Sequence, residues 1–237
     1  KGNEAIAISA IRNGADGYFG YPITPQSEVM ETLMKERPWL TTGMVVLQAE
    51  SETSSINMVY GGACCGKKVM TSSSSPGISL MCEGLSYLAG AELPCVVVNC
   101  QRGGPGLGGI QPAQQDYLQA TKALGHGGFR AMVFAPATLQ EAVDLTYNAW
   151  DYAERYRNPV MILSDGAIGQ VMEKVYVGDY VPRWTDEEIA KNAPWAAFGK
   201  PASRDHNIVT SLELDSAKQE KHNHRFQAKY REMEKND

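Results

Sequence analysis

The sequence predicts an α/β protein with a parallel sheet and helices on both of its faces. Over residues 3–164, segments with helical periodicity alternate with short, apolar, strand-like segments, which is typical of such a sheet. The run Cys-Val-Val-Val-Asn-Cys at 95–100 is continuous and β-branched, as expected of a strand that is covered on both faces.

The first elements are predicted from apolar periodicity and from the residues that end it. Residues 4–12 are expected to be helical, because their apolar side chains share one broad face and Gly14 follows as a stop. A strand is expected at 18–21. A helix at 26–36 then ends ahead of Pro38, since the residue before a proline disfavours helical geometry.

The later elements continue the same alternation. A short apolar strand at 44–47 is expected to lead into a helix that opens with Gln48-Ala49-Glu50-Ser51-Glu52 and runs to Gly61-Gly62. The helix at 139–156 is amphipathic and is entered through Thr138, a suitable N-cap. In order, the further elements are a strand at 67–72, a helix at 78–89, strands at 95–100 and 131–135, the helix at 139–156 and a strand at 159–163.

Two regions are predicted. Residues 1–170 form the α/β domain, and residues 171–237 form an arm followed by a charged helix. Residues 175–200 are rich in proline, tryptophan and charge without clear periodicity, so we expect an extended linker or a wrapping arm. Residues 215–235 have few apolar positions, which suits a surface helix or, against a partner, an interface element. We expect a further C-terminal domain beyond this helix.

Composition excludes several classes of protein. The 237 residues are 43% hydrophobic and 21% charged, with a net charge of −5 and no basic run, so neither nucleic acid nor an anionic membrane is an expected partner. The longest apolar runs are strand-length, too short to span a bilayer, and no secretory leader is visible. We therefore expect a cytoplasmic protein.

The cysteines and histidines do not form a metal motif. The five cysteines contain no Cys-x-x-Cys pair and lie in apolar surroundings, so we interpret them as buried thiols in a reducing compartment. An iron–sulfur cluster usually needs closely spaced thiolates, and the four histidines are scattered. We expect no metal site or cluster on this chain.

Candidate site residues follow strands, where parallel sheets place their ligands. After the strand at 18–21, two prolines stiffen the turn Tyr21-Pro22-Ile23-Thr24-Pro25 and leave the Thr24 hydroxyl as its polar tip. Thr24 could instead cap the next helix. After the strand at 44–47, Glu50 and Glu52 begin a helix of small and apolar residues. They suit either catalysis or the positive end of the helix.

Two further segments follow later strands. In Thr71-Ser72-Ser73-Ser74-Ser75-Pro76-Gly77, hydroxyls and backbone amides could cradle an anion or a polar ligand, although serines before a helix are also ordinary caps. Arg102 leaves the strand at 95–100 and precedes a glycine-rich loop. Its planar guanidinium suits a carboxylate, and the alternative is a surface arginine.

Nucleotide motifs are poor matches. The Gly104-Pro105-Gly106 stretch follows a strand but does not open a helix promptly, and no Walker-type Gly-Lys-Ser/Thr is present. Asp165-Gly166 lacks the downstream asparagine and acidic partners of a metal–diphosphate site, so we interpret it as a turn.

Taken together, these segments resemble the alpha-type subunit of the thiamine-diphosphate-dependent 2-oxoacid:ferredoxin oxidoreductases. The chain looks most like the branched-chain members, which act on 2-oxoisovalerate (3-methyl-2-oxobutanoate). The resemblance extends over residues 1 to about 170. It is carried by Gly2-Asn3-Glu4-Ala5, Gly20-Tyr21-Pro22-Ile23-Thr24-Pro25, Gln48-Ala49-Glu50-Ser51-Glu52, residues 70–80 and Arg102-Gly103-Gly104-Pro105, with 157–163 and His222-Asn223 suiting the branched-chain group.

The resemblance implies a pyrimidine-binding domain and a role for each site residue. In such domains a glutamate hydrogen-bonds the aminopyrimidine ring of the cofactor and so favours the tautomer that removes the thiazolium proton. Such a glutamate commonly stands nine residues before a helix-ending glycine. Glu52 stands nine residues before Gly61, so the resemblance implies that Glu52 is the catalytic glutamate, with Glu50 as the alternative. Thr24 and Arg102 become substrate-binding residues. The further residues expected to bind the cofactor are Tyr21, Pro22, Ile23 and Ser75.

The resemblance also implies partners. A beta-type subunit would bind the diphosphate with Mg²⁺, gamma-type and ferredoxin-like subunits would complete the complex, and iron–sulfur clusters would lie on partner chains. Coenzyme A, a 2-oxoacid and ferredoxin would be the reactants, and the chain would act only in an oligomer. Two alternatives stay open: the same chemistry on 2-oxoglutarate or pyruvate, and a non-catalytic assembly scaffold.

Overall fold

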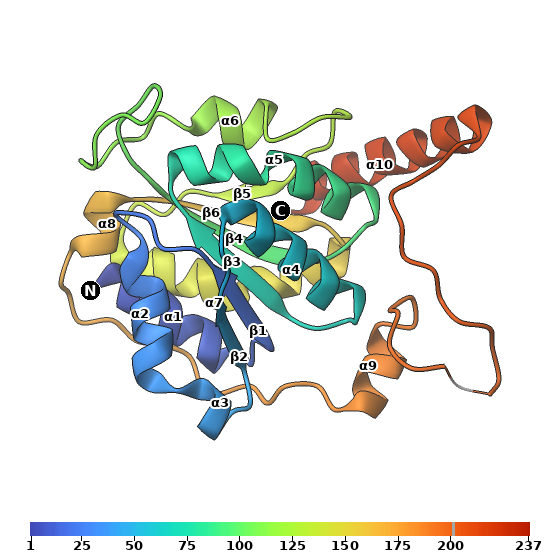
Figure 1. Ribbon diagram of the computed structural model, residues 1–237, viewed down its shortest axis with the longest axis horizontal. Helices are drawn as coiled ribbons and strands as arrows, with labels where there is room; N and C mark the ends of the chain where they lie inside the picture. Colours follow the sequence, from blue (N-terminus) through green and yellow to red (C-terminus); the bar gives the residue numbers. More distant parts are fainter. Residues whose placement is uncertain (201) are drawn as a thin grey trace.

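The computed structural model describes residues 1–200 and 202–237 and confirms the α/β class (Figure 1). Its six-stranded sheet has the order β2-β1-β3-β4-β6-β5, and every pair of neighbouring strands is parallel. The strands are β1 (Gly17–Gly20), β2 (Val45–Gln48), β3 (Val69–Ser73), β4 (Cys95–Gln101), β5 (Met132–Phe134) and β6 (Pro159–Asp165).

Helices cover both faces of this sheet, and strand β4 shows how the sequence supports two cores. Val96 and Val98 face the core built with α1 (Gly2–Arg12), α2 (Ser27–Glu36) and α7 (Leu139–Tyr156). Val97 faces the opposite core, built with α4 (Glu52–Cys64) and α5 (Ser75–Gly90). Successive side chains of a strand point to opposite faces, so an all-apolar strand serves both layers.

The cysteines differ in part from the expectation of five buried thiols. All five are free, but only Cys95 and Cys100 are fully buried, whereas Cys64, Cys65 and Cys82 are half-buried. Burial raises the pKa of Cys95 and of Cys100 to about 12. Both thiols therefore stay neutral at physiological pH.

Four short helices were not predicted. They are α3 (Pro38–Thr41), α6 (Tyr117–Lys122), α8 (Gly166–Gln170) and α9 (Asp186–Asn192). The interpretation of Asp165-Gly166 as a turn was wrong, because the Asp165 carboxylate accepts hydrogen bonds from the amides of Ala167 and Ile168 and so caps α8.

The segment after α8 runs along the sheet edge where the strands begin (Figure 1). Val181 donates a backbone hydrogen bond to Arg12, and Ala197 donates one to Cys64. The final helix α10 (Ser216–Asn236) buries Phe226, Tyr230 and Met233 against Tyr156. None of the helices in the described residues is long and apolar enough to cross a membrane.

The topology creates a crevice where strands end. Strand β1 leads to α2 on one face, whereas its neighbour β3 leads to α5 on the other face. Parallel sheets bind ligands at such switch points, outside the carboxyl ends of the strands. The turn after β1 and the start of α5 therefore flank the expected ligand position.

Candidate active site

Glu52 is the first residue of α4 and is almost fully buried, with 7% of its surface exposed. Ser51 caps the helix by accepting a hydrogen bond from the Ser54 amide. Glu52 is therefore not needed as the cap. No hydrogen bond among the described residues engages its carboxylate. The carboxylate is therefore free to accept a hydrogen bond from an external group.

Burial, not helix length, separates the two glutamates. Helix α4 continues to Cys64, so the expectation that Gly61 ends it was wrong. Glu50 precedes the helix, is exposed, and accepts a weak hydrogen bond from Ser54. The position of Glu52 at the end of the sheet and its burial favour it as the functional carboxylate.

Gly77, in the first turn of α5, packs directly against Glu52 and Ser73. A Cβ atom at this position would lie 2.0 Å from Ser73 Oγ and 2.9 Å from Glu52 Oε1. Glycine is therefore the residue that lets α5 approach the carboxylate and the hydroxyl together. Ser73, the last residue of β3, is a site residue that the sequence did not single out.

The serine run does not cap its helix. Ser74 is the N-cap of α5 by position but makes no side-chain cap hydrogen bond. The hydroxyls of Thr71, Ser73 and Ser74 are buried without a hydrogen-bond partner in the described part of the chain. Buried hydroxyls normally find partners, so the cap interpretation is wrong for Ser74 and a polar ligand is favoured.

Arg102 is buried (6% exposed) just beyond β4, which excludes the surface alternative. Its guanidinium donates hydrogen bonds to the backbone carbonyls of Thr24 (3.0 Å) and Leu107 (3.0 Å), while its buried Nε has no partner in the described residues. The cation therefore joins the two loops that flank the crevice. It is held by carbonyls, and no carboxylate in the described part of the chain pairs with it.

The turn that carries Thr24 is built from predicted site residues and fixed by others. Thr24 and Pro22 are exposed, whereas Tyr21 and Ile23 are half-buried. Thr24 does not cap α2, whose N-cap residue is Gln26. Gln26 was not predicted: its amide donates to the Tyr21 carbonyl (3.0 Å), and its carbonyl oxygen accepts from Ser72 (2.5 Å).

A second unpredicted residue, Asp116, connects Ser75 to the sheet. Ser75 Oγ donates to Asp116 Oδ2 (2.6 Å) and accepts from the Arg102 amide (3.0 Å). Asn99 Nδ2 also donates to Asp116 Oδ2 (2.9 Å). Ser75 thus positions the backbone of Arg102. It is also one of the residues that we expect to bind the cofactor.

A cavity of about 670 Å³ opens beside Thr24. Its walls come from the turn after β1, from α2, from the glycine-rich loop and from α8, and include Pro25, Glu28, Ile110 and Gln170. Among the described residues, no group of three or more histidine, cysteine or acidic side chains could hold a metal ion. Glu28 and Glu31 make this cavity acidic, and neither Glu52 nor Arg102 lines it.

This arrangement defines an α/β protein with a ligand site at the carboxyl edge of its sheet. Residues 8–236 match the family model described as "Pyruvate flavodoxin/ferredoxin oxidoreductase, thiamine diP-bdg". The chain belongs to this family of thiamine-diphosphate-binding domains.

Curated relatives support the same assignment. The whole chain is 47% identical over 240 residues to ketoisovalerate oxidoreductase subunit VorB of Methanothermobacter thermautotrophicus, and spans 65% of that protein. Over 76% of the chain it is 40% identical to 2-oxoglutarate synthase subunit KorA of Methanocaldococcus jannaschii, and the match covers 49% of that protein. The chain therefore spans less than two thirds of these relatives.

A solved structure shares the fold. It is 2-oxoglutarate:ferredoxin oxidoreductase from Magnetococcus marinus with 2-oxoglutarate, coenzyme A and succinyl-CoA bound. The match has a TM-score of 0.80 and 27% sequence identity, and it covers all of this chain and 45% of the other. The expected parallel sheet of a 2-oxoacid:ferredoxin oxidoreductase is thus confirmed.

The residues present fit the pyrimidine half of thiamine diphosphate. The Glu52 carboxylate can accept a hydrogen bond from a protonated ring nitrogen, and the unpartnered Ser73 hydroxyl beside it can bond a polar heterocycle. Gly77 lets α5 pack against both groups, whereas a larger side chain would displace them. The described residues offer no acidic cluster for a metal–diphosphate group.

Proposed function

We propose that this chain is the pyrimidine-binding subunit of a 2-oxoacid:ferredoxin oxidoreductase, and that it acts on 2-oxoisovalerate and other branched-chain 2-oxoacids in the cytoplasm. The reaction joins a 2-oxoacid, coenzyme A and two oxidised ferredoxins into an acyl-CoA, carbon dioxide, a proton and two reduced ferredoxins. The observation that carries this proposal is the buried, unpartnered carboxylate of Glu52 at the carboxyl edge of the sheet.

Each side chain has a task in this reaction. Glu52 accepts a hydrogen bond from the ring nitrogen of the cofactor and exchanges a proton there. Arg102 neutralises the substrate carboxylate, and Thr24, whose carbonyl Arg102 binds, offers its hydroxyl to the same substrate. When bound, thiamine diphosphate supplies the carbon nucleophile and the electron sink for decarboxylation.

The choice of substrate rests on similarity. Identity to the ketoisovalerate oxidoreductase subunit extends over the whole chain, whereas identity to the 2-oxoglutarate synthase subunit is lower and covers 76% of the chain. We assign the diphosphate group and Mg²⁺ to a beta-type partner. Gamma-type and ferredoxin-like partners would complete the complex and carry the iron–sulfur clusters. A cofactor shared between chains makes an oligomer necessary.

The test is a substrate comparison in the purified complex with its partner subunits. Ferredoxin reduction is measured with 2-oxoisovalerate, pyruvate and 2-oxoglutarate at equal coenzyme A. We expect the largest kcat/KM for 2-oxoisovalerate, because a site shaped for a branched chain rejects a second carboxylate. A larger kcat/KM for 2-oxoglutarate would overturn the substrate assignment. Absence of turnover with all three would favour the scaffold alternative.

A further inference from the structure

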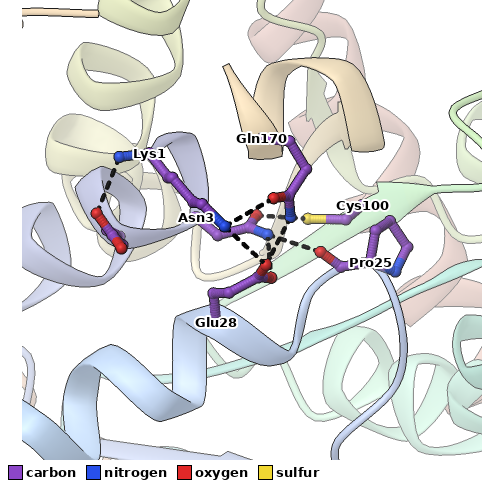
Figure 2. Close-up of polar contacts among 7 residues, drawn as sticks. Lys1, Asn3, Pro25, Glu28, Cys100 and Gln170 are labelled. Atoms are coloured by element: carbon purple, nitrogen blue, oxygen red, sulfur yellow. Dashed lines mark hydrogen bonds and ion pairs between the residues drawn. The ribbon is translucent and has the colours of Figure 1, made fainter. Parts of the chain in front are cut away.

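Asn3 lies at the start of α1, is fully buried, and yet has no place in the proposed chemistry. Its side chain is nevertheless engaged at both ends (Figure 2). The amide nitrogen donates to the Pro25 carbonyl (2.7 Å) and to Glu28 Oε2 (3.0 Å), and the amide oxygen accepts from Cys100 Sγ (3.3 Å). One side chain thus joins three elements that are far apart in the sequence.

Two of these partners adjoin the proposed substrate-binding residues. Pro25 directly follows Thr24, and Cys100 lies two residues before Arg102 on β4. Asn3 therefore links the turn after β1 to strand β4, and the Arg102–Thr24 hydrogen bond links the same turn to the residue that follows β4.

Close backbone packing holds Asn3 in this position. A Cβ at Gly169 would lie 2.7 Å from Asn3 Oδ1, and a Cβ at Gly2 would lie 1.9 Å from the Ile168 carbonyl oxygen. Helix α8 therefore closes over the asparagine, and the two glycines permit that approach. The amide can neither rotate freely nor exchange its partners for water.

The charge of Glu28 determines which side chain fits at position 3. Burial raises the pKa of Glu28, but hydrogen bonds from Gln170 and Asn3 and the charge of Lys1 outweigh it and leave the pKa lowered. Glu28 is therefore ionised at neutral pH. An amide donor satisfies it, whereas a carboxylate of the same shape would repel it and leave the Pro25 carbonyl without a donor.

We propose that Asn3 is a positioning residue for the 2-oxoacid: it holds the Thr24 turn at a set distance from Arg102 by bonding the turn to strand β4. The effect that we expect on turnover rests on the proposed function. Its structural part, the restraint of the turn, is independent of the reaction.

The test compares Asn3→Asp with Asn158→Asp in the assembled complex. Asn158 is a matched control, because it is also fully buried and also donates to backbone carbonyls, those of Arg130 and Pro159, but at the opposite end of the sheet. Amide hydrogen exchange is followed at 21–28 and 100–103, and steady-state kinetics give KM for 2-oxoisovalerate and Kd for thiamine diphosphate.

For Asn3→Asp we expect exchange at 21–28 to accelerate about 10-fold, as for loss of a buried hydrogen bond. We also expect KM for the 2-oxoacid to rise about 10-fold with a smaller change in kcat and in cofactor Kd. Asn158→Asp should change neither. Unchanged exchange at 21–28, or an equal rise of KM in both variants, would overturn the inference. A wild-type complex that turned over no 2-oxoacid would contradict the proposed function, while the exchange data would still decide the role of Asn3.

Discussion

The Glu52 carboxylate and the Ser73 hydroxyl both lie against Gly77. A Cβ placed on Gly77 would lie 2.9 Å from Glu52 Oε1 and 2.0 Å from Ser73 Oγ. The start of α4, the end of β3 and the start of α5 therefore meet at a position that only a hydrogen atom can occupy. This tight packing fixes the positions of two groups that we place in the cofactor-binding site.

Gly77→Ala should push the Glu52 and Ser73 side chains out of place. The added methyl group must displace Ser73 or Glu52, which costs about 1–3 kcal/mol of stability, and it should weaken thiamine diphosphate binding about 10-fold or more. Isothermal titration of the cofactor into the assembled complex measures this. Gly61→Ala is the control, because a Cβ there meets nothing within 4 Å and alanine favours the helix by up to about 1 kcal/mol. Equal cofactor affinity in both variants would show that cofactor binding does not depend on the placement of Glu52 and Ser73.

Arg102→Lys should raise KM for the 2-oxoacid. Arginine bonds the Thr24 and Leu107 carbonyls at once, and lysine cannot reproduce this planar geometry. A charged hydrogen bond contributes about 1.5–3 kcal/mol, so we expect KM to rise about 10- to 100-fold. Arg155→Lys, on the exposed surface of α7, serves as control. A KM within error of wild type would remove Arg102 from the substrate site.

Glu154 predicts a pH dependence of stability away from the active site. Burial raises its pKa from 4.5 to about 7. The charge of Lys68 offsets this only in part, and Asp151 and Asp16 add to it. The folded state therefore binds a proton that the unfolded state releases, so this contribution is fully present below pH 4.5 and is lost as the pH rises through about 7.

Thermal unfolding between pH 4.5 and 8 tests this dependence. Glu154→Gln should remove the loss and give a higher Tm than wild type above pH 7, because the amide stays neutral at every pH. Exposed Glu232→Gln is the control. Parallel Tm curves for wild type and Glu154→Gln would contradict the assignment.

The sequence predicted the sheet and the long helices because their periodicity extends over many residues. The short helix α6 makes no side-chain cap hydrogen bond, so no local pattern marks its start. Helices α3 and α8 carry only short signals, Pro38 in the first turn and the Asp165 cap. Helix α9 carried a readable signal that was overlooked: Thr185 and Glu188 form a capping box.

The sequence allowed prediction of the site residues that stand near the ends of strands. Glu52, Ser75 and Arg102 stand four, two and one residues after the ends of β2, β3 and β4. Asn3 and Asp116 were not predicted, since their partners are distant in the sequence. Asn3 did carry a signal, because it shares the apolar face of α1 with Ile6, Ala7 and Ala10, where an asparagine must find hydrogen-bond partners.

The most direct test of the account is the turnover of Glu52→Gln in the assembled complex, measured as ferredoxin reduction with 2-oxoisovalerate. Glutamine keeps the shape of the side chain but cannot exchange the proton, so we expect a loss of about 10²- to 10⁴-fold in kcat. The exposed neighbour variant Glu50→Gln should keep wild-type turnover. If Glu52→Gln turned over at the wild-type rate, the central claim would be wrong.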